Sequence, residues 1–300
     1  MIISTDYLLD NKTIFEHYAR KTKNVLATNT FANIFAWRDF FEFEFKVIND
    51  SLCVFAHHVL GTFLYLPPLG EKVTRDTVDK CFGYMHDYNE GKNISRVENI
   101  DVYQLKNFYA EHYRPYLKGH EYCYFRNDIA QLEGHDFKSK RSDVNHFIKN
   151  NTFEYLPYDA SMLNDRLALY DLWAINTRLH NSDDICLTML DENYSVQQNV
   201  IVSAEELNMT GRVVKVDGQI KAYTFGYPLN ENTFCIFSEI TDLNIKGSAS
   251  FIFSQFCRDE ALASYPFINV MDDSGIVQLQ QTKMSFHPTH LWPVYSVQSL

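Results

Sequence analysis

Positive charge is scarce in this 300-residue sequence. Lys and Arg together number 27 against 38 Asp and Glu, which gives a net charge of -11. A protein that relies on non-specific contacts to phosphate groups is usually basic. The composition therefore argues against DNA binding. Any contact with RNA or anionic lipid has to come from a local basic patch, and Lys138, Lys140 and Arg141 form one candidate.

Several signatures of well-known chemistry are also absent. The sequence contains no Walker A, Rossmann G-x-G-x-x-G or G-x-S-x-G motif, which argues against the common NTPase, dehydrogenase and hydrolase classes. None of the 6 cysteines lies in a C-x-x-C pair, and the 11 histidines match no zinc spacing. No metal site is expected.

Targeting and membrane segments are the third absence. The first ten residues show no basic segment followed by an apolar run, so no signal peptide is expected. No apolar run approaches the roughly 20 residues that span a bilayer. The cysteines mostly lie in apolar stretches, which suits buried reduced thiols. These features together predict a soluble cytoplasmic protein without a transmembrane segment.

What the sequence has in abundance is aromatic and apolar residues. It contains 23 Phe and 19 Tyr, and 46% of its residues are hydrophobic. This composition builds a dense core and is not that of a disordered chain. The length suits one large domain or two domains of about 150 residues each.

The second half has a readable order of elements. A tight Asp217-Gly218 turn joins two alternating segments, which is typical of a β-hairpin. The expected elements are strands at 211–216, 219–227 and 233–239, a helix at 247–263, a strand at 267–271, a helix at 276–283 and a strand at 291–297.

The first half repeats that order about 165 residues earlier. After a helix at 31–41, we expect strands at 45–48, 52–56 and 62–66, a helix at 74–89, a strand at 94–97, a helix at 102–111 and a strand at 121–126. The repeat rests on element order alone. Between the copies, the 129–172 segment is expected to hold two helices with a strand at 154–156 between them.

The repeated β-β-β-α-β-α-β order resembles the GNAT (acyl-CoA N-acyltransferase) fold. We therefore expect an α/β (α+β) protein with mixed sheets and two tandem GNAT-like domains, at 1–128 and 129–300. The loop after the third strand of the first copy contains Pro67 and Pro68, which remove N–H donors. The first domain is thus expected to be structural or to shape the acceptor site, and the second to carry the transferase site.

The loop after the third strand of the second copy is a candidate donor site. Lys246, Gly247 and Ser248 supply a positive charge, a backbone without Cβ and a small residue at a helix start. Free N–H groups there suit a diphosphate. The alternative is an ordinary helix cap.

The strongest local motif is FINVMDDSGIVQLQQTKMSFHP at 267–288. Asp272 and Asp273 follow a strand, and Gly275 permits a sharp turn. The next helix brings Lys283 back toward these two residues. Paired carboxylates can orient and deprotonate an amine, and a lysine can stabilise charge on a carbonyl or phosphate oxygen. The alternative is an acidic capping turn with a solvent-exposed lysine.

This segment resembles the C-terminal catalytic region of phosphatidylglycerol lysyltransferases and related stand-alone bacterial proteins called DUF2156. Their acidic-Asp-x-Gly, Leu-Arg and Ala-Lys-Leu-Ser-Tyr-x-Pro pattern matches 272–275, 279–280 and 282–288 here. Similar matches occur in the entry helix at 31–38, in the 132–147 segment and at Phe237-Ser238-Glu239.

The resemblance implies two GNAT domains in tandem that move an aminoacyl group from charged tRNA to a lipid hydroxyl or a cell-wall-type acceptor. It implies peripheral contact with membrane lipid and no permanently bound cofactor, with charged tRNA or acyl-CoA as the donor. Motif position makes Asp273, Lys283 and Glu239 catalytic, and Asp272, Ser285, Lys140 and Arg141 substrate-binding.

Two other functions stay open. An acyl-CoA-dependent N-acetyltransferase is favoured by the Lys246-Gly247-Ser248 loop. A catalytically degenerate tandem-GNAT binding protein is favoured by Gln280 and Ile240, which stand where the family has Arg and Lys.

Overall fold

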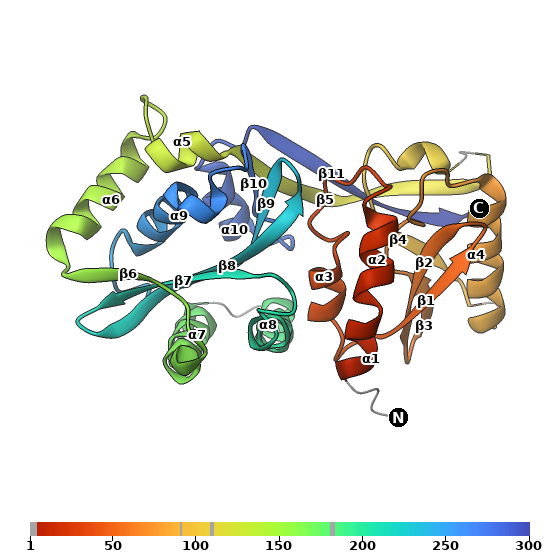
Figure 1. Cartoon of the computed structure of the whole chain (residues 1–300), viewed down its shortest axis with the longest axis horizontal. Helices are drawn as coiled ribbons and strands as arrows, with labels where there is room; N and C mark the ends of the chain where they lie inside the picture. Colours follow the sequence, from red (N-terminus) through yellow and green to blue (C-terminus); the bar gives the residue numbers. More distant parts are fainter. Residues whose placement is uncertain (1–4, 91, 109–110, 181–183) are drawn as a thin grey trace. The chain divides into compact units, whose positions relative to one another are not determined.

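The chain folds into two compact units, which are coloured along the sequence in Figure 1. The computed structural model describes residues 5–90, 92–108, 111–180 and 184–300. Unit 1 comprises Met1–Glu121 and Trp292–Leu300, and unit 2 comprises Tyr122–Leu291. Both units combine helices with a mixed sheet, so the expected α/β class is confirmed.

Unit 1 contains the three consecutive strands that the sequence predicted. Its strands are β1 (Glu42–Ile48), β2 (Ser51–His58), β3 (Gly61–Leu64), β4 (Arg96–Ile100) and parts of β5 (Tyr113–Phe125) and β11 (His290–Ser299). The β1–β2 turn is tight because Asn49 and Asp50 both adopt positive φ, of 47° and 57°. Strands β3 and β4 are parallel, which requires the crossover helix between them.

That crossover is α4 (Arg75–Tyr88), whose first turn is capped by the Thr74 hydroxyl. Its apolar face, which includes Cys81 and Met85, packs on Cys53 and Val97 of the sheet. The other helices of unit 1 are α1 (Thr5–Asp10), α2 (Lys12–Ala19), α3 (Phe31–Ala36) and the 3-10 helix η1 (Leu105–Asn107).

Two expected helices of unit 1 are shorter than the sequence suggested. The helix expected at 31–41 ends at Ala36. The helix expected at 102–111 is reduced, within the described residues, to η1. There the Asp101 carboxylate accepts hydrogen bonds from the backbone N–H groups of Tyr103 and Gln104, which favours a turn over a regular helix.

The strands of unit 2 pair in the order β5-β10-β9-β8-β7-β6. Its further strands are β6 (Phe153–Pro157), β7 (Thr210–Val216), β8 (Gln219–Asn230), β9 (Thr233–Thr241) and β10 (Phe267–Asn269). The β7–β8 turn at Asp217-Gly218 has positive φ at both residues, as expected for the hairpin. β9 and β10 pair in parallel, whereas β5 with β10, β6 with β7, β7 with β8 and β8 with β9 are antiparallel.

The helices of unit 2 lie in two layers around this sheet, as Figure 1 shows. One layer contains α5 (Arg126–Gln131), α6 (Lys138–Asn150), α9 (Ser248–Arg258) and α10 (Val277–Met284). The other contains α7 (Leu163–His180) and α8 (Asp184–Val202). Short 3-10 helices, η2 (Ala160–Met162) and η3 (Glu260–Leu262), precede α7 and follow α9. The two helices and strand expected between the copies are α6, β6 and α7, whereas α8 was not predicted.

Each helix layer closes a separate apolar core of unit 2. The core on the α9 face includes Phe147, Ala222, Phe234, Ile236 and Phe256. The core on the α7 face includes Leu169, Tyr170, Tyr223, Phe225 and Ile240. Successive side chains of β8 point to opposite faces of the sheet, so Ala222 lies in one core and Tyr223 in the other.

The thiols are reduced where the structure describes them. Cys53, Cys81, Cys123, Cys235 and Cys257 are buried and form no disulfide, as the sequence predicted, while the side chain of Cys186 lies outside the described residues. Among the helices described, none has the length and apolar composition needed to cross a bilayer.

Gly247 has a packing role where α6 meets α9. It has φ of +85°, and a Cβ built there would lie 2.2 Å from the backbone oxygen of Asp143 on α6. No side chain can occupy that position unless the two helices separate. The absence of Cβ at Gly247 is therefore required by the contact between these helices, independently of any donor.

We predict that Gly247→Ala destabilises the protein more than Gly218→Ala. Both glycines have positive φ, which costs an alanine about 1–2 kcal/mol, but a Cβ at Gly218 meets nothing within 4 Å. Urea unfolding of both variants measures the difference. Equal losses would show that α6 and α9 can separate without cost.

Candidate functional site

The candidate site begins where β9 and β10 stop pairing. Thr233–Cys235 of β9 pair in parallel with Phe267–Asn269 of β10, and β9 then runs on to Thr241. We call residues 236–241 the β9 extension. A register shift between Phe225 and Gly226 places a β-bulge at the start of this extension, and a bulge bends its strand. The bend directs β9 away from the line of β10.

Two of the predicted catalytic carboxylates flank this separation. In the parallel register, Glu239 lies four residues beyond Cys235, and Asp273 lies four residues beyond Asn269. Both residues thus follow the point at which the ladder between β9 and β10 ends. The β9 extension directs some of its backbone N–H and C=O groups toward the same space.

Glu239 lies on the face of β9 that points toward α9, opposite Thr224 of β8. Its Oε2 is buried and makes no hydrogen bond among the described residues, and the same is true of Thr224 Oγ1. Burial raises the pKa of Glu239 from 4.5 to about 8, and Thr224 only partly opposes the rise. The group thus exchanges its proton near neutral pH, as an acid–base residue must.

Asp273 is held by two donors in the turn after β10. Its Oδ2 accepts a hydrogen bond from the phenol of Tyr122, and its Oδ1 accepts one from the backbone N–H of Gly275 at 2.9 Å. Burial and the neighbouring Asp273 carboxylate raise the pKa of Tyr122 to about 12. Gln280, which stands where the family pattern has Arg, contacts the same phenol and favours its ionised form.

Lys283 is directed at the backbone of the segment that follows β10. Its Nζ donates to the carbonyl oxygens of Val270 at 2.7 Å and Met271 at 3.4 Å, and also to that of Asp272. A lysine that bridges three successive carbonyls fixes the conformation of the chain leading to Asp273. Its position supports the carboxylate, and the ammonium also lies 5.6 Å from the ring centroid of Tyr122.

Asp272 and Ser285 lie in the same motif with different surroundings. The Asp272 side chain is exposed, and its Oδ1 accepts a long hydrogen bond from Ser274 at 3.4 Å. Ser285 ends α10, and its hydroxyl donates to the backbone oxygen of Thr282 at 2.6 Å. Asp272 is therefore the residue of this pair that is open to a substrate.

Lys140 and Arg141 begin α6 and contact different parts of unit 2. Lys140 lies 4.1 Å from the ring centroid of Phe286, and its partial burial lowers its pKa. Arg141 donates to the backbone oxygens of Leu132 and Gly134 and so holds the end of α5. Lys140 thus contacts the segment that follows α10, whereas Arg141 makes structural contacts to the backbone that follows α5.

The predicted donor loop lies at the start of α9. Lys246 is exposed, and Ser248 is buried with its hydroxyl 3.5 Å from the backbone oxygen of Asp242. No described side chain caps α9, and the first N–H group of the helix, that of Ser248, donates to the backbone oxygen of Ile245 at 3.2 Å. The expectation that this loop holds the donor stays a prediction.

Tyr122 and Thr224 were not among the site residues predicted from the sequence. Alternation in β5 places Tyr122 and Tyr124 on one face, and both phenols contact the Asp273–Lys283 segment, Tyr124 by donating to the Lys283 backbone oxygen at 2.9 Å. This period of two was the available signal. Thr224 carried no signal, because only strand pairing brings it opposite Glu239.

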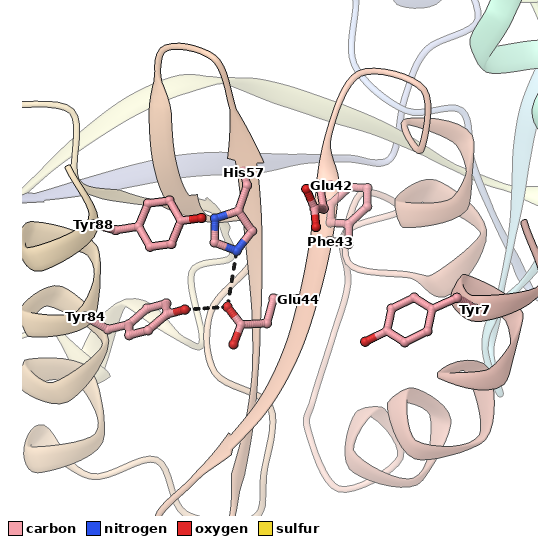
Figure 2. A pocket seen from close by; sticks show the side chains of 7 residues that line it. All are labelled: Tyr7, Glu42, Phe43, Glu44, His57, Tyr84 and Tyr88. Carbon is pink, nitrogen blue, oxygen red and sulfur yellow. Dashed lines mark hydrogen bonds and ion pairs between the residues drawn. The ribbon is translucent and has the colours of Figure 1, made fainter. Parts of the chain in front are cut away.

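Unit 1 contains a separate pocket of about 300 Å³ that holds none of the predicted site residues. Figure 2 shows Glu44 pointing toward His57 and Tyr84, whose Nε2 and hydroxyl lie 3.2 Å and 2.6 Å from Glu44 Oε2. The other lining residues are Tyr7, Glu42, Phe43 and Tyr88. Because His57 also contacts the Thr62 hydroxyl at 2.7 Å, both of its ring nitrogens have partners within unit 1.

We predict that Glu239→Gln changes how stability depends on pH. Between about 4.5 and about 8, folded Glu239 keeps a proton that the unfolded chain releases, so this contribution is complete below 4.5 and lost as pH rises through 8. The amide cannot ionise. Relative to wild type, the variant should therefore gain at least about 1.4 kcal/mol, the equivalent of one pKa unit, between pH 5 and pH 9.

Urea unfolding across that pH range provides the measurement, with Glu231→Gln as the control because Glu231 is exposed on the β8–β9 turn. Parallel pH profiles for wild type and Glu239→Gln would show that Glu239 titrates like a solvated carboxyl.

We predict that Lys283→Met lowers the free energy of unfolding by about 1–3 kcal/mol, because three carbonyl oxygens lose a charged donor. Lys246→Met is the matched control, since Lys246 is exposed. Thermal or urea unfolding gives both values. An equal, small effect in both variants would identify Lys283 as an ordinary surface lysine.

Comparison with solved structures confirms the fold class. A conserved protein of unknown function from Bacteroides thetaiotaomicron matches with a TM-score of 0.86 and 23% identity, over 100% of this chain and 99% of that one. The structure of L-PGS from Bacillus licheniformis gives 0.64 and 15%, over 95% and 91%. A tandem GNAT protein from the clavulanic acid biosynthesis pathway gives 0.51 and 6%, over 99% and 97%.

Sequence comparison gives the family. No curated protein matches the chain. The family model described as "Phosphatidylglycerol lysyltransferase, C-terminal" matches residues 20–298, which spans nearly the whole of both units. The expected tandem GNAT-like architecture and the resemblance carried by the 267–288 motif are thus confirmed, and the chain belongs to the phosphatidylglycerol lysyltransferase C-terminal family.

Proposed function

We propose that unit 2 is an aminoacyltransferase that moves an aminoacyl group from charged tRNA to the hydroxyl group of a lipid. One observation carries the proposal: Glu239 has a buried oxygen without a hydrogen-bond partner and a pKa of about 8, and it lies on the β9 extension, which has left its pairing with β10. Family membership supports the choice of an aminoacyl group and a lipid acceptor.

The reaction needs a base, a place for the oxyanion and a route for the proton. The acceptor oxygen forms a bond to the ester carbonyl carbon, and its proton passes to the Glu239 carboxylate. The bond from the carbonyl carbon to the terminal ribose oxygen of the tRNA then breaks, and Glu239 returns the proton to that leaving oxygen. A pKa near 8 suits both transfers at neutral pH.

The remaining groups orient the reactants. The amino group of the aminoacyl moiety is a cation, and Asp273 lies four residues beyond the last residue of β10 that pairs with β9. Tyr122, Gly275 and the Lys283 bridge hold this part of the chain in place, so Asp273 can bind the ammonium without reorganising. Backbone N–H groups of the β9 extension supply donors to the oxyanion.

Basic side chains near the start of α9 are suited to the tRNA. Lys246 is exposed there, and α6, which carries exposed Lys138, packs against Gly247. Since the whole chain has a net charge of -11, such a local patch has to supply the phosphate contacts.

We predict that Glu239→Gln lowers kcat for aminoacyl transfer by about 100-fold or more, because removal of a general base has an effect of that size. Asp273→Asn should mainly raise KM for the aminoacyl donor, because it removes the charge partner of the ammonium. The assay follows radiolabelled aminoacyl groups from tRNA into phosphatidylglycerol vesicles, with Glu231→Gln as the control.

Acetyl-CoA with amine acceptors is assayed in parallel. Glu239-dependent acetyl transfer without aminoacyl transfer would replace this proposal with the N-acetyltransferase alternative. If wild type transferred neither group, both transfer proposals would fail for these substrates, and the binding-protein alternative would stand.

A further inference from the structure

A second polar centre of unit 2 lies on the other face of the sheet, under α7. Arg166 is fully buried, and none of its three side-chain nitrogens makes a hydrogen bond among the described residues. An arginine keeps its charge in a protein, so this cation cannot escape its environment by losing a proton. A buried charge without a partner costs several kcal/mol.

The other arginines of unit 2 provide the comparison. Each of them donates to a carbonyl oxygen or a carboxylate: they are Arg126, Arg141, Arg178, Arg212 and Arg258. Arg212, for example, makes two hydrogen bonds to the carboxylate of Asp259, at 2.6 and 3.0 Å. Arg166 is the most buried of the six and has no equivalent acceptor within the described part of the chain.

Polar, uncharged side chains lie close to Arg166. Its guanidinium carbon lies 5.5 Å from the ring centroid of Tyr223, whose hydroxyl donates to Gln197 of α8 at 2.9 Å. Ser238 projects from the same face of the sheet, since it pairs with Phe225 of that core, and its buried hydroxyl also lacks a hydrogen-bond partner. We call Arg166, Tyr223, Ser238 and Gln197 the Arg166 cluster.

We infer that the Arg166 cluster binds an oxyanion, a carboxylate or phosphate group of a ligand. The guanidinium presents parallel N–H donors whose spacing matches two oxygens of such a group, and the Ser238 hydroxyl supplies a further donor. The bound anion supplies the counter-charge that the described residues do not provide. Burial raises the pKa of Tyr223, while the Arg166 charge and the polar contacts of the phenol with Arg166 and Ser238 oppose the rise. The phenol is neutral near pH 7 and does not repel the anion.

Partly buried side chains, Tyr158 among them, cover the core that contains the cluster. Tyr158, Met162 and Trp173 are half-buried side chains that pack against the core around the cluster. The Arg166 charge opposes the rise in the pKa of Tyr158 that burial causes, so the phenol lies within electrostatic reach of the guanidinium. Because Arg166 itself is closed to solvent, an entering anion has to displace one of these covering side chains.

This site does not depend on the proposed transfer reaction. Ser238 and Glu239 are successive residues of β9 and project to opposite faces, Ser238 toward α7 and Glu239 toward α9. Oxyanion binding can therefore be measured without turnover, and loss of Glu239 should leave it unchanged.

The test uses the full chain with wild type, Arg166→Met and Arg178→Met. Arg178 is the matched control, because it lies on the same helix, is exposed and pairs with Asp191. Thermal unfolding is followed while sodium phosphate, or separately sodium acetate, replaces sodium chloride at constant ionic strength. Isothermal calorimetry with the same two anions gives the affinities.

Phosphate, acetate or both should raise the Tm of wild type and Arg178→Met. Arg166→Met should lose this response, with at least tenfold weaker binding. Without added oxyanion, Arg166→Met should be as stable as wild type or more so, since it no longer buries an unpaired charge. The stronger of the two anions identifies the ligand group as phosphate or carboxylate.

Absence of any response in wild type, or an equal response in Arg166→Met, overturns the proposal. If Arg166→Met does not fold, Arg166→Lys replaces it, because a lysine keeps the charge but not the paired donors. An unchanged affinity in that variant likewise overturns the proposal.

Discussion

The chemistry proposed for unit 2 depends on the short length of the ladder between β9 and β10. Their parallel ladder covers only Thr233–Cys235 and Phe267–Asn269, after which the bulge in β9 separates the two strands. Each strand is held from its other side. β9 stays paired with β8 along its length, while β10 is antiparallel to β5, and Tyr122 exchanges backbone hydrogen bonds with Val270 and Met271 just beyond it. The separation is therefore a property of the folded sheet.

Unsatisfied polar groups in unit 2 occur next to this sheet, on both of its faces. Glu239 and Thr224 face α9, and Arg166 and Ser238 face α7. Elsewhere in the same unit, buried or half-buried charges are paired, as in the Arg212–Asp259 and Lys221–Asp242 contacts. An unpaired buried group costs stability, and the two proposed ligands would supply partners to Glu239 and Arg166.

The position of a residue in a motif did not by itself distinguish residues that could contact a substrate from residues that only stabilise the fold. Arg141 falls in a matching segment, yet it holds the carbonyl oxygens at the end of α5. Gly247 matches an expected diphosphate loop, yet its missing Cβ is already required by the contact with Asp143. Ile240, which replaces a family lysine, points into the α7-face core, away from Glu239, so this replacement removes no charge from the Glu239 side. Only the packing around each residue distinguishes these roles.

Hydrophobic periodicity and turn chemistry determined the order of elements, because both are local properties of the chain. The Asp217-Gly218 hairpin, the β7–β8–β9 series and the α9–β10–α10 sequence could all be predicted in this way, as could the 267–288 motif. Helix ends were less predictable: a side chain such as that of Asp101 can divert the backbone into a turn. The helix α8 carries polar residues over much of its length and was not predicted.

The tertiary structure alone decided which side chains lose water. The raised pKa of Glu239, the Tyr122–Asp273 contact and the unpaired charge of Arg166 all arise from strand pairing and helix packing between residues far apart in the sequence. Desolvation is a property of the surroundings, and a residue's neighbours in sequence do not specify it.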